Sequence, residues 1–242
     1  MDLISKNNKP KIHPSVIAAW AALIAVAYML PVIPLVVTGG YFTVSAAFLP
    51  LAGIFFGPFM GALCAAIGSF IGQIIAPQAA WLGLGTFVIG TVNALTAGFI
   101  SRGKWPYAVG IILIGFGLWY STAIGRAALV YPFIVYGLGV LTAVVGGIFG
   151  SKWLKGNNYR LKLLAIWLIA FTAFIGAAGI GNYLGIIVKQ TPAQVYKALV
   201  FVTPLERTIF ALGSAFIGLP LLAALPKIGI FIEPGSDRQK FI

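Results

Sequence analysis

The sequence contains few charged and few chemically reactive side chains. Only 8% of its 242 residues are Asp, Glu, Lys or Arg, and it has one His and one Cys, whereas soluble domains carry about 25% charged residues. A metal site needs several His, Cys or carboxylate ligands, and a nucleophile needs a neighbouring base. His13 precedes Pro14 and Cys64 lies in an apolar run, so neither has such partners nearby in the sequence. We therefore expect no metal, no cofactor and no enzymatic activity.

Acidic residues are especially scarce. Glu206 is the only acid between Asp2 and Glu233, so the chain lacks the series of intramembrane carboxylates that a proton relay uses. It also lacks a G-x-x-x-x-G-K-[ST] stretch for binding nucleotide phosphates. Any uphill transport in which this chain takes part must therefore draw its energy from partner proteins.

Apolar residues make up 60% of the chain, and its mean hydropathy is +1.02. The formal net charge of +12 would suit nucleic acid if the cations formed one basic surface. They lie instead in short segments between apolar runs, where they act as topology signals that face lipid headgroups. We expect a multi-pass protein of the cell membrane that does not bind nucleic acid.

Six apolar runs have the length of about 20 residues that a membrane-spanning helix needs. They cover residues 15–37, 82–101, 105–125, 130–151, 163–187 and 203–225.

A seventh apolar run, residues 43–76, is too long for one span. As a single helix it would measure roughly 50 Å, against a hydrocarbon core of about 30 Å. Gly57-Pro58 lies near its middle. Because proline interrupts helices and fits their first turn, we expect two shorter helices, over 43–57 and 58–76. Recurring glycines allow close contact with neighbouring helices.

The distribution of basic residues favours two crossings within this run. With two, every Lys and Arg lies on the side of the N-terminus except four: Arg126, Lys189, Lys197 and Arg207. A single crossing would divide the cations almost equally, contrary to the positive-inside rule. We expect an all-α, polytopic membrane helical bundle of about eight transmembrane segments, two of them short, with both termini cytoplasmic. Residues 1–14 form the cytoplasmic N-terminal segment, 15–226 the transmembrane bundle and 227–242 the cytoplasmic tail.

The stretch "FTVSAAFLPLAGIFFGPFMGALCAAIGSFIG", Phe42 to Gly72, resembles the substrate-binding S components of energy-coupling factor (ECF) transporters. In that family a short apolar helix ends at a G-P-x-x-G-A turn, here Gly57 to Ala62, and a glycine-rich helix follows. The resemblance implies a subunit that captures a small-molecule substrate and works with a transmembrane coupling subunit and cytoplasmic ATPases. Common vitamin-type members have six helices, two fewer than we expect here.

The family also carries small residues at four-residue spacing on its first helix, and these contact the coupling subunit. The matching positions here are Ala18 with Ala22, and the overlapping pair Ala21 with Ala25. Independently of any family, such spacing places two small side chains on one helix face, where a partner helix approaches closely. A contact within the chain is the alternative.

Three charged residues on the outer side are candidates for substrate binding: Arg126, Glu206 and Arg207. Charges near hydrocarbon are costly and often functional. Two converging arginines would hold a carboxylate or phosphate, while Glu206 would orient one of them or meet a substrate amine. Alternatively, the arginines extend to lipid headgroups and Glu206 pairs with Arg207 or caps a helix.

Aromatic and amide side chains extend the candidate site. A flat heterocyclic substrate would stack on rings such as those of Trp81 and Tyr120, although an interfacial aromatic belt also explains them. Amides within or at the ends of spans offer polar contacts to a ligand or to a neighbouring helix. These amides are Gln73, Gln78, Asn93 and Asn182.

The segment between the first two helices has the composition of a lid. Gly39 and Gly40 supply hinge freedom, and Tyr41 and Phe42 supply a cap over an outward pocket. The resemblance implies the same role, and an ordinary turn is the alternative. The leading hypothesis is thus the substrate-binding subunit of an ECF-type importer for a small vitamin-like or micronutrient solute. An accessory structural subunit of a larger membrane complex is the alternative.

Overall fold

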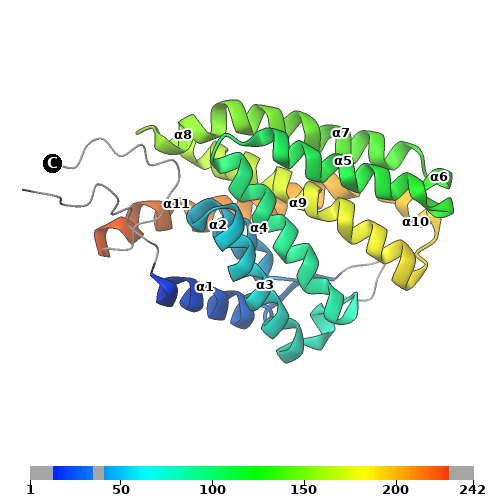
Figure 1. Ribbon diagram of the computed structural model, residues 1–242, viewed down its shortest axis with the longest axis horizontal. Helices are drawn as coiled ribbons and strands as arrows, with labels where there is room; N and C mark the ends of the chain where they lie inside the picture. Colours follow the sequence, from blue (N-terminus) through cyan, green and yellow to red (C-terminus); the bar gives the residue numbers. More distant parts are fainter. Residues whose placement is uncertain (1–12, 35–40, 229–242) are drawn as a thin grey trace, which may run out of the picture.

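The computed structural model describes residues 13–34 and 41–228 as a bundle of helices (Figure 1). The main helices are α1 (Pro14–Ala27), α2 (Ser45–Phe56), α3 (Pro58–Ile75), α4 (Phe87–Ser101), α5 (Trp105–Ser121), α7 (Val130–Val145), α9 (Tyr159–Lys189) and α11 (Val202–Ala224). Shorter elements connect them: β1 (Pro31–Pro34), β2 (Tyr41–Thr43), α6 (Ala123–Ala127), the π-helical turn η3 (Gly146–Gly150), α8 (Ser151–Lys155), α10 (Ala193–Ala198) and the 3₁₀ turns η1 (Pro77–Ala79), η2 (Gly83–Thr86) and η4 (Leu225–Ile228).

The all-α membrane bundle is confirmed, with corrections to its short segments. Among the described residues, five helical stretches are long and apolar enough to cross a membrane. Helices α1, α2 and α5 are apolar but shorter. We predicted that both pieces of the run 43–76 would be short. In the structure α2 has 12 residues and α3 has 18, so only α2 is short, and α1 with 14 residues is the second very short helix.

The first predicted span is wrong beyond Ala27. The helix ends there, and β1 pairs antiparallel with β2, with Pro34 opposite Tyr41. Pro31 and Pro34 explain the change, because proline cannot donate an amide hydrogen bond in a helix and disfavours helical geometry in the preceding residue. Residues 35–40 lie outside the described residues.

The predicted break at Gly57-Pro58 is confirmed. Gly57 has φ +91°, a conformation that favours glycine, and Pro58 is the first residue of α3. A Cβ at Gly98 of α4 would meet the backbone of Pro58, so α4 crosses this turn at backbone contact. The turn therefore depends on glycine at both positions.

Contacts between α1 and α3 show that the run 43–76 crosses the bundle twice. The thiol of Cys64 lies 3.4 Å from the carbonyl oxygen of Ile17, and further along both helices a Cβ at Gly72 would meet the ring of Tyr28. Residue numbers thus rise together along α1 and α3, so the two helices run parallel. Helix α2, which connects them, must run in the opposite direction, and the predicted double crossing follows.

Helix α9 forms the centre of the bundle, and most of its middle third is buried. Helices α5 and α7 lie along one side of α9, and α1 and α3 lie on the other (Figure 1). Gly115 of α5 meets Gly179 of α9 at backbone contact, because a Cβ at Gly115 would lie 2.7 Å from the Gly179 Cα. Such contacts substitute for the hydrophobic driving force that helices lack in lipid.

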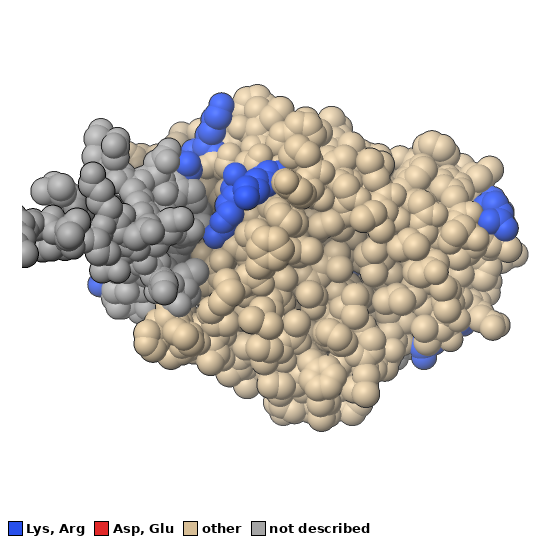
Figure 2. All heavy atoms as spheres, in the orientation of Figure 1, with Lys and Arg blue, Asp and Glu red and all other residues tan. Residues whose placement is uncertain are grey.

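Basic side chains on one face of the molecule lie near its two ends. On the face in Figure 2, Lys and Arg lie near the two ends of the long axis, and a wide uncharged region separates them. Helix α1 begins and α11 ends at the same end of the molecule (Figure 1). We refer to this end as inner and the opposite end as outer, following the positive-inside expectation.

Candidate substrate cavity

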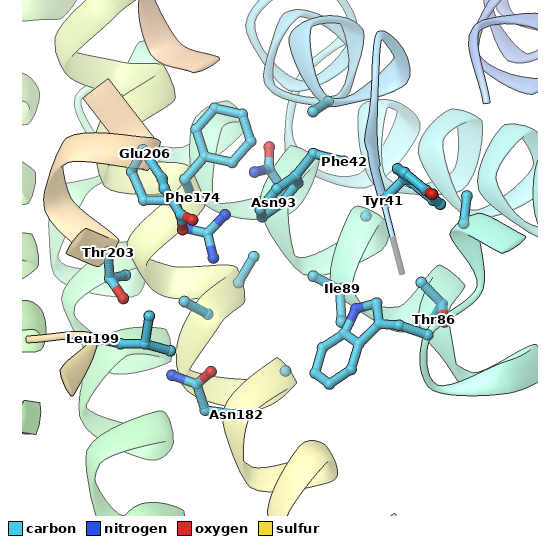
Figure 3. A pocket seen from close by; sticks show the side chains of 18 of the residues that line it. Tyr41, Phe42, Thr86, Ile89, Asn93, Phe174, Asn182, Leu199, Thr203 and Glu206 are labelled. Atoms are coloured by element: carbon cyan, nitrogen blue, oxygen red, sulfur yellow. The ribbon is translucent and has the colours of Figure 1, made fainter. Parts of the chain in front are cut away.

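A cavity of about 500 Å³ lies between α2, α4, α9 and α11, and residues of β2 and α10 complete its wall. Its lining includes the residue before α4 (Thr86), residues near the end of α9 (Asn182) and residues at the start of α11 (Thr203) (Figure 3). These helix ends all belong to the outer half of the bundle. Seven aromatic rings line it: Tyr28, Tyr41, Phe42, Trp81, Tyr131, Phe174 and Tyr196.

Glu206 and Arg207 bring one negative and one positive charge into this cavity. Among the described residues Arg207 makes no hydrogen bond, its Nε is enclosed without a partner, and its guanidinium lies 4.7 Å from the centre of the Phe42 ring. Glu206 likewise forms no hydrogen bond or ion pair with any described residue. A guanidinium offers five N–H donors in a planar fork. Both groups are therefore available to a polar ligand.

Asn93 and Trp81 also line the cavity, as shown for Asn93 in Figure 3. Asn93 is 2% exposed, and its Oδ1 has no hydrogen-bond partner among the described residues. The Trp81 ring packs against α9, where a Cβ at Gly185 would lie 3.1 Å from it. Gln73, by contrast, does not line the cavity, and its Nε2 donates to the carbonyl oxygen of Leu84 at 2.8 Å.

Arg126 and Tyr120 lie away from the cavity lining. Arg126 is exposed, and its Nη1 donates to the carbonyl oxygens of Tyr120 at 2.9 Å and Ser121 at 3.2 Å. These carbonyls belong to the last turn of α5, where a cation complements the helix dipole. The Tyr120 hydroxyl donates to the carbonyl of Leu129 at 3.1 Å. The cavity therefore contains Arg207 without Arg126.

Half of the predicted lid can be placed. Tyr41 and Phe42 lie on β2 and line the cavity (Figure 3), whereas Gly39 and Gly40 lie outside the described residues. The Phe42 ring also lies 4.5 Å from that of Phe210 on α11, centre to centre. Phe42 thus connects β2 to the same helix that carries Arg207.

Asn182, one of the candidate amides, is the centre of a hydrogen-bonded cluster whose pairing the sequence did not indicate. The Asn182 Nδ2 donates to the hydroxyl of Tyr131 at 3.0 Å and to that of Tyr136 at 3.2 Å. Tyr196 of α10 donates to the Asn182 backbone carbonyl at 3.4 Å, and burial raises the pKa of Tyr196 to about 12, so it stays protonated at neutral pH. Asn182 was recognisable as an amide in an apolar helix, but its tyrosine partners were not.

The four alanines of α1 divide between two environments. Ala18 and Ala22 are exposed, whereas Ala21 and Ala25 are each 3% exposed and pack within the chain. All four border a groove of about 520 Å³ between α1 and α3, whose other wall includes Ile67, Ile71 and Ile75. The exposed pair is the one that a partner helix can reach.

Comparisons with known proteins identify the family of the chain. The chain is 26% identical over 166 residues to an uncharacterized protein of Methanocaldococcus jannaschii, an alignment that covers 69% of this chain and 56% of that relative. No solved structure matches the chain. A family model for the ECF-type riboflavin transporter S component matches residues 12–135, just over half of the sequence, including the Gly57-Pro58 turn and α1 to α5. The chain belongs to the ECF-type riboflavin transporter S component family.

Proposed function

We propose that this protein is the substrate-binding subunit of an ECF-type importer and that it captures riboflavin, or a closely related flat heterocycle, from the outer side of the cell membrane. The observation that carries the proposal is a cavity of about 500 Å³ in which aromatic rings surround Glu206 and Arg207, neither of which is hydrogen-bonded to a described residue. Ligand sites of about 300–1,000 Å³ with mostly apolar walls and a few polar groups are typical of small-molecule binding. The family name supplies the substrate.

The chemistry of riboflavin suits these walls. Its planar three-ring system can stack on aromatic side chains such as Trp81 and Phe174. Its ring carbonyls and nitrogens accept hydrogen bonds, which suits the N–H groups of Arg207, since none of them is bonded to a described residue. Its sugar-alcohol chain and its imide N–H donate hydrogen bonds, as the carboxylate of Glu206 requires.

Partners would supply the energy. The exposed pair Ala18 and Ala22 gives α1 a face on which a coupling subunit can pack closely. Cytoplasmic ATPases would then drive transport, in keeping with the absence of a nucleotide-binding motif in the sequence. Association with ATPases in a pull-down would support this role, and association with subunits of another membrane enzyme instead would favour an accessory structural role.

The direct test is titration of riboflavin into the purified protein with flavin fluorescence as the signal. We expect saturable quenching at a ratio of one riboflavin per chain, because stacked aromatic rings quench flavin emission. Thiamine, a smaller cationic vitamin that is not a flavin, serves as the control ligand and is tested as a competitor, which should not displace bound riboflavin. No saturable binding of riboflavin, or equal binding of both vitamins, would refute the proposal.

A further inference from the structure

The side-chain amide of Asn182 has a defined orientation at the cavity wall. A primary amide carries two N–H donors and one carbonyl acceptor. Both donors are used, because Nδ2 bonds to the hydroxyls of Tyr131 and Tyr136 at 3.0 and 3.2 Å. The Oδ1 atom accepts no hydrogen bond from any described residue. In Figure 3 this oxygen lies on the cavity side of the Asn182 amide and the nitrogen on the far side.

The two tyrosines are themselves held firmly in place. The Tyr131 hydroxyl lies 3.3 Å from the Oγ1 of Thr203, and its ring stacks on Trp119 with centres 5.0 Å apart at 18°. Tyr136 is 1% exposed, and its ring meets that of Trp119 edge to face at 6.2 Å. Trp119 is fully buried on α5. The α5–α7 hairpin thus forms a rigid support behind Asn182.

Tyr131 and Tyr136 differ in their relation to a ligand. Tyr131 lines the cavity and has Thr203 as a second partner, so its substitution would alter the wall directly. Tyr136 is not part of the lining. Tyr136 reaches the lining through its hydroxyl, which accepts from Asn182, and through its ring, whose centre lies 6.1 Å from that of Tyr131. Replacing Tyr136 with Phe keeps the ring contact and removes only the hydrogen bond to Asn182.

We propose that Tyr136 is a positioning residue that fixes Asn182 with Oδ1 toward the cavity, and that the substrate must present an N–H or O–H donor to this oxygen. This inference rests on the proposed function and extends it with a chemical requirement on the substrate. A solute without that donor leaves Oδ1 desolvated and unpaired, which is how buried polar groups reject analogues that lack a hydrogen-bonding group.

The test measures the affinity of the purified protein for three probes by flavin fluorescence. The probes are riboflavin, riboflavin methylated at its imide nitrogen, which lacks the N–H, and lumiflavin, which lacks the hydroxyl chain. The variants are Tyr136→Phe, Asn182→Leu, their combination and Asn182→Asp. Tyr120→Phe is the matched control, because the Tyr120 hydroxyl donates to a carbonyl outside the cavity.

We expect Asn182→Leu to weaken riboflavin binding roughly 10- to 100-fold and Tyr136→Phe about tenfold. In the Asn182→Leu background Tyr136→Phe should have no further effect on affinity, which a merely structural role would not produce. One of the two analogues should already bind weakly to the wild type and lose little more in Asn182→Leu. Asn182→Asp keeps the acceptor and should bind better than Asn182→Leu, and Tyr120→Phe should match the wild type.

Three results would overturn the inference while leaving the proposed function intact. In the first, the losses of riboflavin affinity in Tyr136→Phe and Asn182→Leu add up in the double variant. In the second, Asn182→Leu lowers the affinity for all three probes by the same factor. In the third, Asn182→Asp binds riboflavin as weakly as Asn182→Leu does. The last of these would mean that the amide donates to the substrate. No riboflavin binding by the wild type would overturn this inference and the proposed substrate together.

Discussion

Replacing Arg207 with Gln should weaken riboflavin binding strongly while changing protein stability little. The guanidinium makes no hydrogen bond to any described residue, so its donors are free to bind substrate. A hydrogen bond to a charged group contributes about 1.5–3 kcal/mol, which corresponds to a roughly 10- to 150-fold loss of affinity. Glutamine can replace one donor, which places the expected loss near the lower end of this range.

The stability effect should be small because two contributions oppose each other. The contact between Arg207 and the Phe42 ring at 4.7 Å stabilises the protein by about 0.5–2 kcal/mol. Removing an incompletely paired charge from the cavity wall relieves a desolvation cost of similar size. The net change in unfolding free energy should be within about 1 kcal/mol.

The assay compares riboflavin affinity and melting temperature for Arg207→Gln and for Arg126→Gln as the matched control. Arg126 has the same charge and lies on the same side, but it is exposed and bonded to the carbonyls of Tyr120 and Ser121. Its substitution should leave the affinity unchanged within about twofold. Equal losses in the two variants, or an unchanged affinity in Arg207→Gln, would refute the assignment of Arg207 to the binding cavity.

Three further predictions concern packing, pH and partner contact. Gly68→Ala should lower the melting temperature, because the added Cβ would lie 2.6 Å from a carbonyl oxygen of α1. A Cβ at Gly110 meets open space, so Gly110→Ala should raise the melting temperature slightly. Equal shifts in the two variants would contradict the α1–α3 contact. Burial raises the pKa of Tyr196 from 10.0 to about 12, so the folded protein holds the hydroxyl proton more tightly than the unfolded chain does. The contribution of Tyr196 to stability is therefore complete below pH 10 and is lost as pH rises toward 12. The melting temperature of the wild type should therefore fall more between pH 10 and 12 than that of Tyr196→Phe. Equal falls in the two proteins would argue against burial of the hydroxyl. Ala22→Leu should reduce co-purification of ATPase partners and leave riboflavin affinity unchanged. Ala19 is exposed but lies outside the groove, so Ala19→Leu should change neither co-purification nor affinity. Retention of the partners by Ala22→Leu would exclude this face as the docking surface.

Much of the fold could be predicted because membrane-spanning helices are long apolar runs that can be recognised in the sequence. The break at Gly57-Pro58 was visible for a different reason: glycine permits backbone conformations that other residues rarely adopt, and proline interrupts a helix. The pairing of β1 with β2 was not predictable from hydropathy, because an apolar strand and the end of an apolar helix have the same composition.

The site was predictable in its charges and not in its geometry. Arg126 and Arg207 were equivalent in the sequence, and only their surroundings separate them: one satisfies carbonyls at the end of α5, and the other faces the cavity. The two partners of Asn182 lie 51 and 46 residues away in the sequence. Such contacts depend on how the α5–α7 hairpin packs against α9, which no local pattern specifies.

The most direct test of an outward substrate cavity is side-specific labelling of one cysteine at its wall. Leu199 lines the cavity (Figure 3), and replacing it with Cys in a Cys64→Ala background gives a chain with a single thiol. In intact cells, a membrane-impermeant maleimide added from outside should label this thiol, and riboflavin should protect it. Labelling only after the inner side is opened, or labelling that riboflavin does not change, would contradict the account.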